Sequence, residues 1–366
     1  MTKIFQLLNS LNDGGVSSLV RNYSLMLKQD GFDVYVIVIY PNKKSSVHKA
    51  LEKNGIKIIS LYPERNLIFR LINRLCGRFI LKKKLKRLID IHNPSVIHVH
   101  SSLLGLVCKI KDSLNNTKLF YTCHSIPERY FAGDRKKEYY AAKELIRDND
   151  MTMIGLHQEM VHELNGMFGI DTARLIYNGV NPKLYYKSYD KRCSLRAALG
   201  IPKNAFVIGH VGRFEDVKNH KYLVSIYSSL RLIREESFLV LVGDGSLQGE
   251  IEDSLNNIKA DYRILSHRTD IPDLLNIMDV FVFPSKYEGM PLALIEAQYA
   301  GRPCVVSKNI NKECVFSTNT HVMDINLNPE EWAKCIASIE NRPETVSCDK
   351  FDLNMIIKKL EKLYME

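Results

Sequence analysis

Short apolar runs alternate with segments of helical periodicity along most of the chain. Lys3–Ser10 is mostly apolar, Ser17–Gln29 repeats apolar positions every three or four residues, and Asp33–Tyr40 is again an apolar run. Apolar runs of this length favour strands that are covered on both faces. Strands separated by helices predict right-handed crossovers, and therefore a parallel sheet with helices on both faces.

The same alternation continues, is interrupted once, and then restarts. Before the interruption we expect a helix at Val47–Lys53 and strands at Lys57–Leu61, Val96–Val99, Leu119–Thr122, Met151–Gly155 and Ala173–Tyr177. After it we expect strands at Phe206–Val211, Phe238–Val242, Tyr262–Leu265, Val280–Pro284 and Pro303–Ser307, and helices at His220–Arg231, Ile271–Ile277, Pro291–Tyr299 and Phe351–Tyr364. The interruption is the polar stretch Asn181–Ser194, which we interpret as a link between domains.

A pattern that restarts after a link predicts two Rossmann-like α/β domains rather than one large sheet. The predicted domains are residues 1–182 and 183–349, with the last helix, 350–366, joining the first domain. The length of 366 residues agrees, at roughly 100–200 residues per domain. Ligands of open α/β sheets bind beyond the carboxyl ends of the strands, so we expect functional loops directly after strands, in a cleft between facing sheets.

Composition excludes several classes of protein. A chain with 45% hydrophobic and 25% charged residues is neither disordered nor collagen-like. The longest apolar run, Val34–Tyr40, is far shorter than the roughly 20 residues that cross a bilayer. Polar residues at Asn9, Asn12 and Asp13 interrupt the N-terminal apolar segment, so we expect no signal peptide and a cytoplasmic location. The eight cysteines form no C-x-x-C pair, and we expect reduced thiols without a metal site.

Positive charge is concentrated at the front of the chain. Residues 1–100 hold 17 basic and 6 acidic residues, whereas the remainder holds 34 and 35. The densest stretch, 65–90, has nine basic residues, one acidic residue, and leucines at helical spacing. This pattern favours a basic amphipathic helix on an anionic membrane surface; a solvated helix face over the domain core is the alternative. We expect no nucleic-acid binding, because no aromatic platform interleaves the charges.

Candidate chemistry follows two predicted strands of the second domain. In Glu288-Gly-Met-Pro-Leu-Ala-Leu-Ile-Glu296, Pro291 suits a first helical turn, which places Glu288 in a loop and Glu296 on a helix. The backbone N–H groups of Gly289–Leu292 would then face an anion such as a diphosphate. A helical carboxylate suits a ribose diol, and a loop carboxylate suits sugar hydroxyls or developing positive charge. Two solvated glutamates are the alternative.

Two basic residues follow the strand Phe206–Val211. Arg213 and Lys218 lie five residues apart in Gly-Arg-Phe-Glu-Asp-Val-Lys (212–218). A guanidinium fork and an ammonium at one strand end could clamp two phosphates. Simple surface solvation is the alternative.

Together these motifs resemble the retaining GT-B glycosyltransferases of family 4. The resemblance rests on residues 212–218, on Val-Gly-Asp-Gly-Ser-Leu (242–247) and on the segment 279–296, in the family's order. Four N-terminal motifs are similar to the same family: Gly-Gly-Val (14–16), His-Val-His (98–100), Thr-Cys-His (122–124) and Tyr-Asn-Gly-Val (177–180). The resemblance spans about residues 3–307 and is nearest to bacterial exopolysaccharide and capsule transferases.

The resemblance implies a role for each matching residue. In the second domain, Glu296 would hold the ribose of a nucleotide-sugar and Glu288 would contact the transferred sugar. The remaining contacts there would be the amides of Gly289, Met290 and Leu292, the diphosphate ligands Arg213 and Lys218, and Arg268 beside the base. Ser266-His267 replaces the glycine that the family usually has before this arginine. In the first domain, His124 would contact the donor sugar near the reacting carbon, and Gly15 would let a loop approach phosphate or acceptor.

The implied reaction is transfer of a hexosyl group from a nucleotide-sugar, most simply a UDP-sugar, to a lipid-linked or growing cell-surface glycan. Retention without an enzymic nucleophile implies front-face attack, with the first domain binding the acceptor at the inner face of the cell membrane. No cofactor or metal is expected, since Arg213, Lys218 and a helix N-terminus would neutralise the phosphates. The alternatives are an epimerase or phosphorylase-like enzyme on the same architecture, and a non-catalytic sugar-nucleotide-binding partner of a transferase.

Three further motifs are interpreted structurally. Asp148-Asn-Asp150 resembles a metal-binding D-x-D motif but precedes an apolar run, so we interpret it as a helix end. His98 and His100 lie on one face of a strand without an evident third ligand. We expect packing at the sheet edge, or an acceptor contact by His100. Gly243-x-Gly245-x3-Gly249 lacks the acidic partner of a dinucleotide loop, and we interpret it as a turn.

Overall fold

The computed structural model divides the chain into two units. It describes residues 1–62, 67–114, 116–131, 135–340 and 346–366, and in residues 67–78 the backbone alone. Unit 1 is Met1–Gly179 together with Leu353–Glu366, and unit 2 is Val180–Asp352. The expected boundaries at 182 and 350 lie within three residues of this division.

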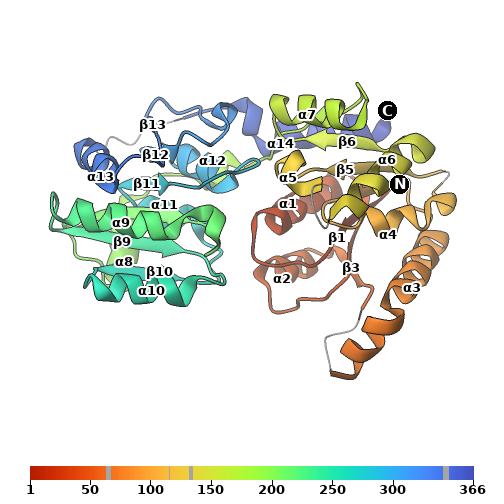
Figure 1. Ribbon diagram of the computed structural model, residues 1–366, viewed down its shortest axis with the longest axis horizontal. Coiled ribbons are helices and arrows are strands. Elements are labelled where there is room, and N and C mark those ends of the chain that lie inside the picture. The colour runs from red at the N-terminus through yellow and green to blue at the C-terminus, as the bar shows by residue number, and fades with distance from the viewer. Residues whose placement is uncertain (63–66, 115, 132–134, 341–345) are drawn as a thin grey trace. The chain divides into compact units, whose positions relative to one another are not determined.

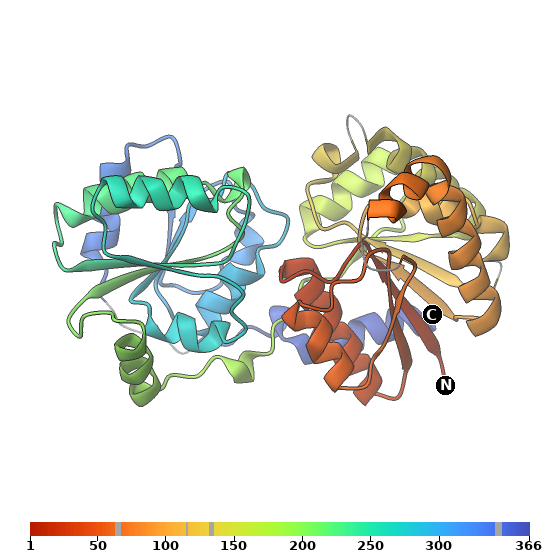
Figure 2. The ribbon, with the colours of Figure 1, turned by 90° about the horizontal axis from the view of Figure 1, so that it is seen from below.

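Unit 1 is built on a seven-stranded parallel sheet of order β3-β2-β1-β4-β5-β6-β7. Its strands are β1 (Lys3–Leu8), β2 (Asp33–Val38), β3 (Lys57–Ser60), β4 (Val96–Val99), β5 (Lys118–Thr122), β6 (Thr152–Gly155) and β7 (Arg174–Leu175). Its helices are α1 (Gly15–Gln29), α2 (Ser46–Lys53), α3 (Leu67–His92), α4 (Leu104–Cys108), α5 (Pro127–Phe131), α6 (Lys136–Asn149), α7 (Gln158–Phe168) and the C-terminal α14 (Leu353–Met365). Helices α1 and α2 cover one face of the sheet, and α3 and α4 cover the other (Figures 1 and 2).

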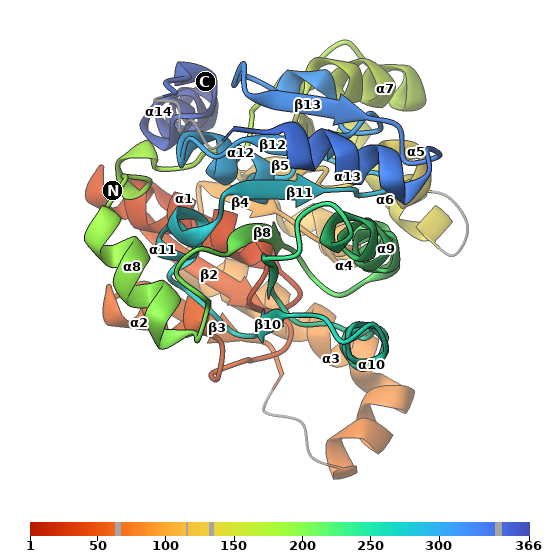
Figure 3. The same ribbon diagram turned by 90° about the vertical axis from the view of Figure 1, so that its left-hand side faces the viewer.

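Unit 2 repeats the design with a six-stranded parallel sheet of order β10-β9-β8-β11-β12-β13. Its strands are β8 (Phe206–Val211), β9 (Ser237–Val242), β10 (Tyr262–Leu265), β11 (Val280–Phe283), β12 (Cys304–Ser307) and β13 (Thr320–Met323). Its helices are α8 (Tyr189–Ala198), α9 (His220–Arg231), α10 (Gln248–Asn257), α11 (Ile271–Ile277), α12 (Leu292–Tyr299) and α13 (Pro329–Ser338). Helices α9, α10 and α13 cover one face, and α8 and α11 cover the other (Figure 3).

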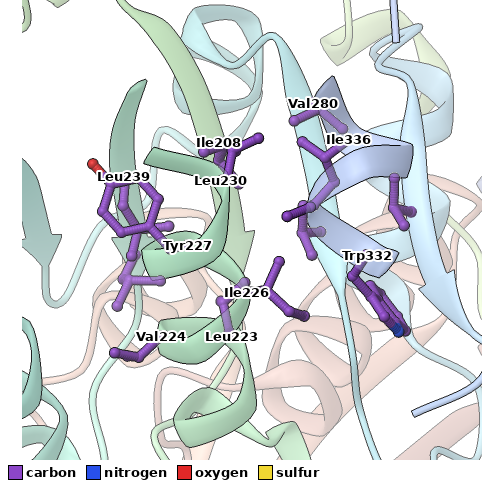
Figure 4. Close-up of a cluster of buried hydrophobic side chains, with 14 of the residues drawn as sticks. Ile208, Leu223, Val224, Ile226, Tyr227, Leu230, Leu239, Val280, Trp332 and Ile336 are labelled. Carbon is purple, nitrogen blue, oxygen red and sulfur yellow. The ribbon is translucent and has the colours of Figure 1, made fainter. Parts of the chain in front are cut away.

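An apolar core holds α9 and α13 against the sheet of unit 2 (Figure 4). Ile208, Leu239 and Val280 project from three strands, and Tyr227 and Trp332 come from the two helices. Trp332 is fully buried, and its indole N–H donates to the carbonyl of Asp324 at 2.9 Å. Burial of an aromatic side chain of this size dominates core energetics, because it removes the largest apolar area from water.

Each sheet reverses its strand order once, which fixes where a ligand is expected. The reversal lies between β1 and β4 in unit 1, and between β8 and β11 in unit 2. Loops at the carboxyl ends of such strand pairs diverge and leave a crevice, the usual ligand position of open α/β sheets. A ligand is therefore expected at the loops that follow these strands.

The stretch Asn181–Ser194, interpreted as a link between domains, directly follows the boundary between the two units, but the interpretation missed that α8 begins inside it. Ser188 caps the helix by accepting a hydrogen bond from the N–H of Lys191. The polar residues around it favoured a link, so the start of the helix was not predicted. The helix is then anchored by Arg196, whose buried guanidinium donates to Asp279 at 2.6 Å. Arg192 and Arg196 thus attach the helix to the rest of unit 2, whereas Lys191 is half exposed.

The interpretation of the acidic triplet Asp148-Asn-Asp150 is confirmed. The acidic triplet is a helix end: α6 ends at Asn149, and Asp150 has the left-handed φ of 48° typical of a C-cap. Asp148 pairs with Lys111 and Arg147. Among the residues that the structure describes, no helix is long and apolar enough to cross a membrane, and no group of histidine, cysteine or acidic side chains could hold a metal ion.

Candidate active site

Lys218 and Glu288 meet at the carboxyl ends of β8 and β11. Lys218 Nζ lies 2.6 Å from Glu288 Oε1, and the two side chains are only 17% and 14% exposed. The ammonium also lies 4.9 Å from the ring centroid of Phe283, the last residue of β11. Because β8 and β11 flank the reversal of strand order, the ion pair occupies the expected ligand position. Limited solvent access strengthens charge–charge interactions there.

The loops after β8 and β11 are tied together, which explains this pairing. Asn219 Nδ2 donates to the carbonyl of Pro284 at 3.2 Å, and the N–H of Lys286 donates to the carbonyl of Val217 at 2.8 Å. Asn219 has a φ of 58°, a left-handed conformation that asparagine tolerates better than most residues. Hydrogen bonds on either side of Lys218 thus hold its loop against the loop that carries Glu288.

The glycine motif after β9 supports the loop that carries Arg213. Phe214 N–H donates to the carbonyl of Asp244 at 2.7 Å. Gly243 and Gly245 have φ values of 143° and 158°, and a Cβ atom on Gly245 would lie 2.5 Å from the carbonyl oxygen of Phe214. The motif is a turn, as expected, but the expectation missed why it requires glycine: two backbones approach too closely for side chains.

Arg213 does not join the Lys218–Glu288 pair. Its side chain is 61% exposed, and its Nη2 donates to Glu215 Oε1 at 3.2 Å. Glu215 in turn accepts from Ser246 Oγ at 3.0 Å. Of the four charged residues expected to converge, the structure brings Lys218 and Glu288 together and places Arg213 at the rim of the loop.

Glu296 lies on α12, as the sequence predicts, with a partly buried side chain. The helix begins at Leu292, so Pro291 is its N-cap residue rather than its first helical residue. Gly289 and Met290 lie in the loop before it, and the first N–H groups of any α-helix have no partner within the helix. Met290 is buried, with its sulfur 3.3 Å from Cys314 Sγ, so its side chain is occupied in the core.

Arg268 follows β10 and is held by a neighbouring carboxylate. Its Nε donates to Asp270 Oδ1 at 2.7 Å, and a second hydrogen bond joins the same two side chains. The preceding residue, His267, has a φ of 55°, a conformation that favours glycine. His267 therefore keeps the backbone shape that a glycine would give, and its Nδ1 lies 3.3 Å from Asp244 Oδ2.

In unit 1 the expected residues follow β1 and β5. Gly15 is the first residue of α1, and Gly14 is its N-cap in an extended conformation. His124 follows β5, and its Nε2 lies 3.1 Å from His100 Nδ1, the two rings being stacked with centroids 5.3 Å apart. Burial lowers the pKa of His124 to about 4, so the ring is neutral near pH 7.

Sequence reasoning missed two residues of this histidine cluster. Gln6 Oε1 lies 2.6 Å from His100 Nε2, and Tyr364 OH lies 2.5 Å from His98 Nδ1. Gln6 left a signal, since it is the one polar side chain within the buried part of β1. Tyr364 left none, because a tyrosine near the end of an amphipathic helix is ordinary.

Comparisons with known proteins agree with the geometry. Residues 13–184 match the family model "Glycosyltransferase Family 4", and residues 192–353 match "Glycosyl transferases group 1". The chain is 27% identical to the EpsF protein of Bacillus subtilis, over 85% of this chain and 80% of EpsF. It is 28% identical to the UDP-Gal:alpha-D-GlcNAc-diphosphoundecaprenol alpha-1,3-galactosyltransferase of Escherichia coli, over 79% of this chain and 78% of that enzyme.

Among solved structures, HepE of Anabaena in complex with UDP and glucose has a TM-score of 0.81 and 20% identity, with all of both chains covered. Two Rossmann-like units of this kind define the GT-B class of glycosyltransferases. The chain belongs to glycosyltransferase family 4, as the motif order predicted, and is similar to bacterial polysaccharide members of that family.

Proposed function

We propose that the protein transfers a hexosyl group, with retention of configuration, from a UDP-sugar to a lipid-linked or growing cell-surface glycan. The observation that carries this proposal is the Lys218–Glu288 pair at the reversal of strand order in unit 2. The pair combines an ammonium group that can bind a phosphate with a carboxylate that can bind sugar hydroxyls. The similarity to a transferase named for UDP-Gal and a diphosphoundecaprenol-linked acceptor supports both substrate classes.

In the proposed reaction, the diphosphate displaces Glu288 as the partner of Lys218. The released carboxylate is then available to the sugar hydroxyls. Donor binding therefore replaces the Lys218–Glu288 ion pair by a contact of Lys218 with the diphosphate and a contact of Glu288 with the sugar. Arg213, exposed at the loop, turns from Glu215 to the same diphosphate. Glu296 holds the ribose, and Arg268 flanks the base. The backbone N–H groups at Gly289, Met290 and Leu292 add fixed partial positive charge.

The transfer itself is a front-face substitution. The bond between the anomeric carbon and the diphosphate oxygen breaks, and the acceptor hydroxyl oxygen bonds to the same face of that carbon. The leaving diphosphate takes the hydroxyl proton. Catalysis then rests on positioning and on stabilisation of the leaving group's charge by Lys218 and Arg213. In this proposal neither a metal nor a cofactor takes part.

We also propose that unit 1 binds the acceptor and that the basic segment 65–90 contacts an anionic membrane surface. Residues 65 and 66 lie outside the described residues, and the side chains of 67–78 are not described. In the remainder of α3, Lys82, Lys83 and Arg87 are exposed, whereas Leu85 and Ile89 are buried against unit 1. This part of α3 therefore offers a basic outer face, and Phe79, which is 72% exposed, extends it with an apolar side chain.

The test begins with thermal stabilisation of the full chain by UDP-, GDP- and ADP-sugars, because a ligand of the folded form raises the melting temperature. The stabilising donor is then incubated with a sugar–diphosphate–polyprenol acceptor. We expect UDP release only when the acceptor is present, and a product that keeps the donor's anomeric configuration. Conversion of the donor without acceptor would indicate an epimerase instead. Binding of UDP without any turnover would indicate a non-catalytic partner.

A further inference from the structure

A chain of buried polar side chains leads from the C-terminal helix to His124 in unit 1. Tyr364 OH lies 2.5 Å from His98 Nδ1 and accepts from Gln6 Nε2 at 3.4 Å. Gln6 Oε1 lies 2.6 Å from His100 Nε2, and His100 Nδ1 lies 3.1 Å from His124 Nε2. Gln6 and His98 are paired across β1 and β4, at the reversal of strand order. These hydrogen-bonded side chains therefore lie where a ligand of unit 1 is expected.

The carboxamide of Gln6 determines which imidazole nitrogens carry protons. Its oxygen only accepts, so His100 Nε2 must carry the proton of that hydrogen bond. A neutral imidazole has one N–H, which leaves a lone pair on His100 Nδ1. His124 Nε2 faces that lone pair and must carry its own proton. His124 Nδ1 is then left as an acceptor.

All three rings are neutral near pH 7, as this argument requires. Burial lowers the pKa of His98 to about 3 and that of His124 to about 4. Burial and the two neighbouring rings lower the pKa of His100 well below its ordinary value. Each ring therefore donates through one nitrogen and accepts through the other.

The phenol of Tyr364 couples the orientation of the Gln6 amide to the tautomer of His98. When the hydroxyl donates to His98 Nδ1, its lone pair accepts from Gln6 Nε2, and His98 Nε2 donates to Thr122 Oγ1 at 2.7 Å. Turning the amide by 180° would exchange donor and acceptor in every hydrogen bond between Tyr364 and His124. His124 Nδ1 would then be a donor, so the two arrangements make opposite predictions for that atom.

We propose that Gln6, His100 and Tyr364 are positioning residues that hold His124 as its Nε2–H tautomer, so that its Nδ1 accepts a hydrogen bond from a hydroxyl group of the transferred sugar. The inference rests on the proposed function, in which His124 contacts the donor sugar. Within the described residues no hydrogen bond reaches His124 Nδ1, which leaves it available to a ligand. A site that accepts from a hydroxyl discriminates against a donor sugar that lacks it, because the bound sugar then covers His124 Nδ1 and leaves this acceptor unpaired.

The tautomer is measured directly by long-range proton–nitrogen NMR on the full chain with nitrogen-15-labelled histidine. Substitution of His124 assigns its signals. In the wild type we expect His124 protonated at Nε2 only. Gln6→Met, which keeps the side chain's size but removes both hydrogen bonds, should give a mixture of tautomers at His124. Phe120→Leu is the matched control. Phe120 packs 5.1 Å from the ring of Tyr364 but makes no side-chain hydrogen bond, so this variant should keep the wild-type tautomer.

A wild-type His124 protonated at Nδ1 would overturn the inference, and so would an unchanged tautomer in Gln6→Met. If Gln6→Met does not fold, Tyr364→Phe tests the same step by freeing the amide. In the transferase assay, Gln6→Met should lower kcat/KM for the donor about tenfold, the effect of one hydrogen bond, and Phe120→Leu should not. Absence of transfer by the wild type, with the expected tautomer present, would instead contradict the proposed function and the ligand role of Nδ1 with it.

Discussion

At the scale of single residues, the interaction between Lys218 and Glu288 is the most informative contact of unit 2. Each side chain comes from a different strand end, and the pair is mostly shielded from water. An ion pair of this kind is strongly coupled, because removal of one partner leaves the other charge poorly solvated. Lys286 offers a comparison on the adjacent loop, where its ammonium pairs with the well-exposed Asp216.

Lys218→Ala should lower kcat roughly 30- to 1,000-fold, because a charge-assisted contact to the leaving diphosphate is lost. This corresponds to a loss of about 2–4 kcal/mol of transition-state stabilisation. The measurement is steady-state kinetics together with a melting curve that establishes folding. Lys286→Ala should change kcat less than twofold, because its ion pair is exposed. Equal turnover by Lys218→Ala and the wild type would remove Lys218 from the site.

At the scale of elements, the loops that carry chemistry depend on close backbone contacts elsewhere in unit 2. The loop Gly212–Phe214 packs against the glycine turn after β9, with almost no space between the two backbones. The turn itself makes no proposed substrate contact. Its effect on the site is therefore indirect, through the position of Arg213.

Gly245→Ala should destabilise unit 2 by about 1–3 kcal/mol and lower activity, because the added Cβ atom lies within 3 Å of the Phe214 backbone. Gly249→Ala is the matched control in the same motif. No atom lies within 4 Å of the added Cβ, and alanine in a helix gains about 0.5–1 kcal/mol over glycine. Denaturant unfolding of both variants compares the two effects. Equal free energies of unfolding for Gly245→Ala and Gly249→Ala would show that the loops after β8 and β9 can move apart without loss of stability.

Helix α14 is attached to α1 partly through two carboxyl groups. Burial and a hydrogen bond with Asp30 raise the pKa of Glu361 from 4.5 to about 7. The protonated form is favoured in the folded state, so this contribution to stability is complete below pH 4.5 and is lost as the pH rises through 7. The two residues also line a surface hollow of about 630 Å³ between α14 and the turn that follows α1.

Glu361→Gln should remove this pH dependence, because the amide cannot ionise and can still donate to Asp30. Melting temperatures of the wild type should fall between pH 4.5 and 7 relative to those of the variant, and the two curves should run parallel above and below that window. Glu252→Gln, at an exposed position of α10, controls for the loss of one charge. Parallel curves at every pH would contradict a shared proton between Glu361 and Asp30.

At the scale of the whole molecule, the sequence predicts the layers of the two sheets better than it predicts the site. The strands Val96–Val99, Phe206–Val211 and Tyr262–Leu265 have the observed bounds. The first two are almost entirely buried, whereas Tyr262–Leu265, at the edge of its sheet, is only partly buried. Helix α8 was not predicted, because buried arginines attach it to the rest of unit 2, and an arginine in a sequence normally predicts an exposed position.

The site was predicted in part, for a related physical reason. Lys218 and Glu288 could be placed at neighbouring strand ends, since topology brings such loops together. Gln6 and Tyr364 could not be connected to His124, because the contacts depend on side chains 358 positions apart. Pairing at that separation leaves no periodic signal along the chain.

The charge asymmetry of the chain leads to a prediction about membranes. Lys82→Gln, Lys83→Gln and Arg87→Gln, combined, should weaken partitioning onto vesicles with anionic lipids roughly a hundredfold, at about 1 kcal/mol per charge. Lys84 and Lys86 are left unchanged, because they bond the carbonyl of Leu61 and the carboxylate of Asp90. Co-sedimentation measures the binding.

The matched control carries three substitutions at exposed lysines elsewhere in unit 1, namely Lys43, Lys49 and Lys53 to glutamine. Net charge changes equally in both variants, so only the α3 variant should lose binding. Equal loss in both would mean that overall charge, rather than this helix, attracts the protein to the membrane. No binding by the wild type would refute the membrane proposal.

The membership of α14 in unit 1 has a consequence for the order of synthesis. Residues 353–366 follow unit 2 along the chain, yet they complete a unit whose other 179 residues precede it. All residues of unit 2 are therefore synthesised before unit 1 receives the Tyr364 hydroxyl. Removal of residues 353–366 would leave the residue set of unit 2 whole and deprive unit 1 of the helix that carries this hydroxyl.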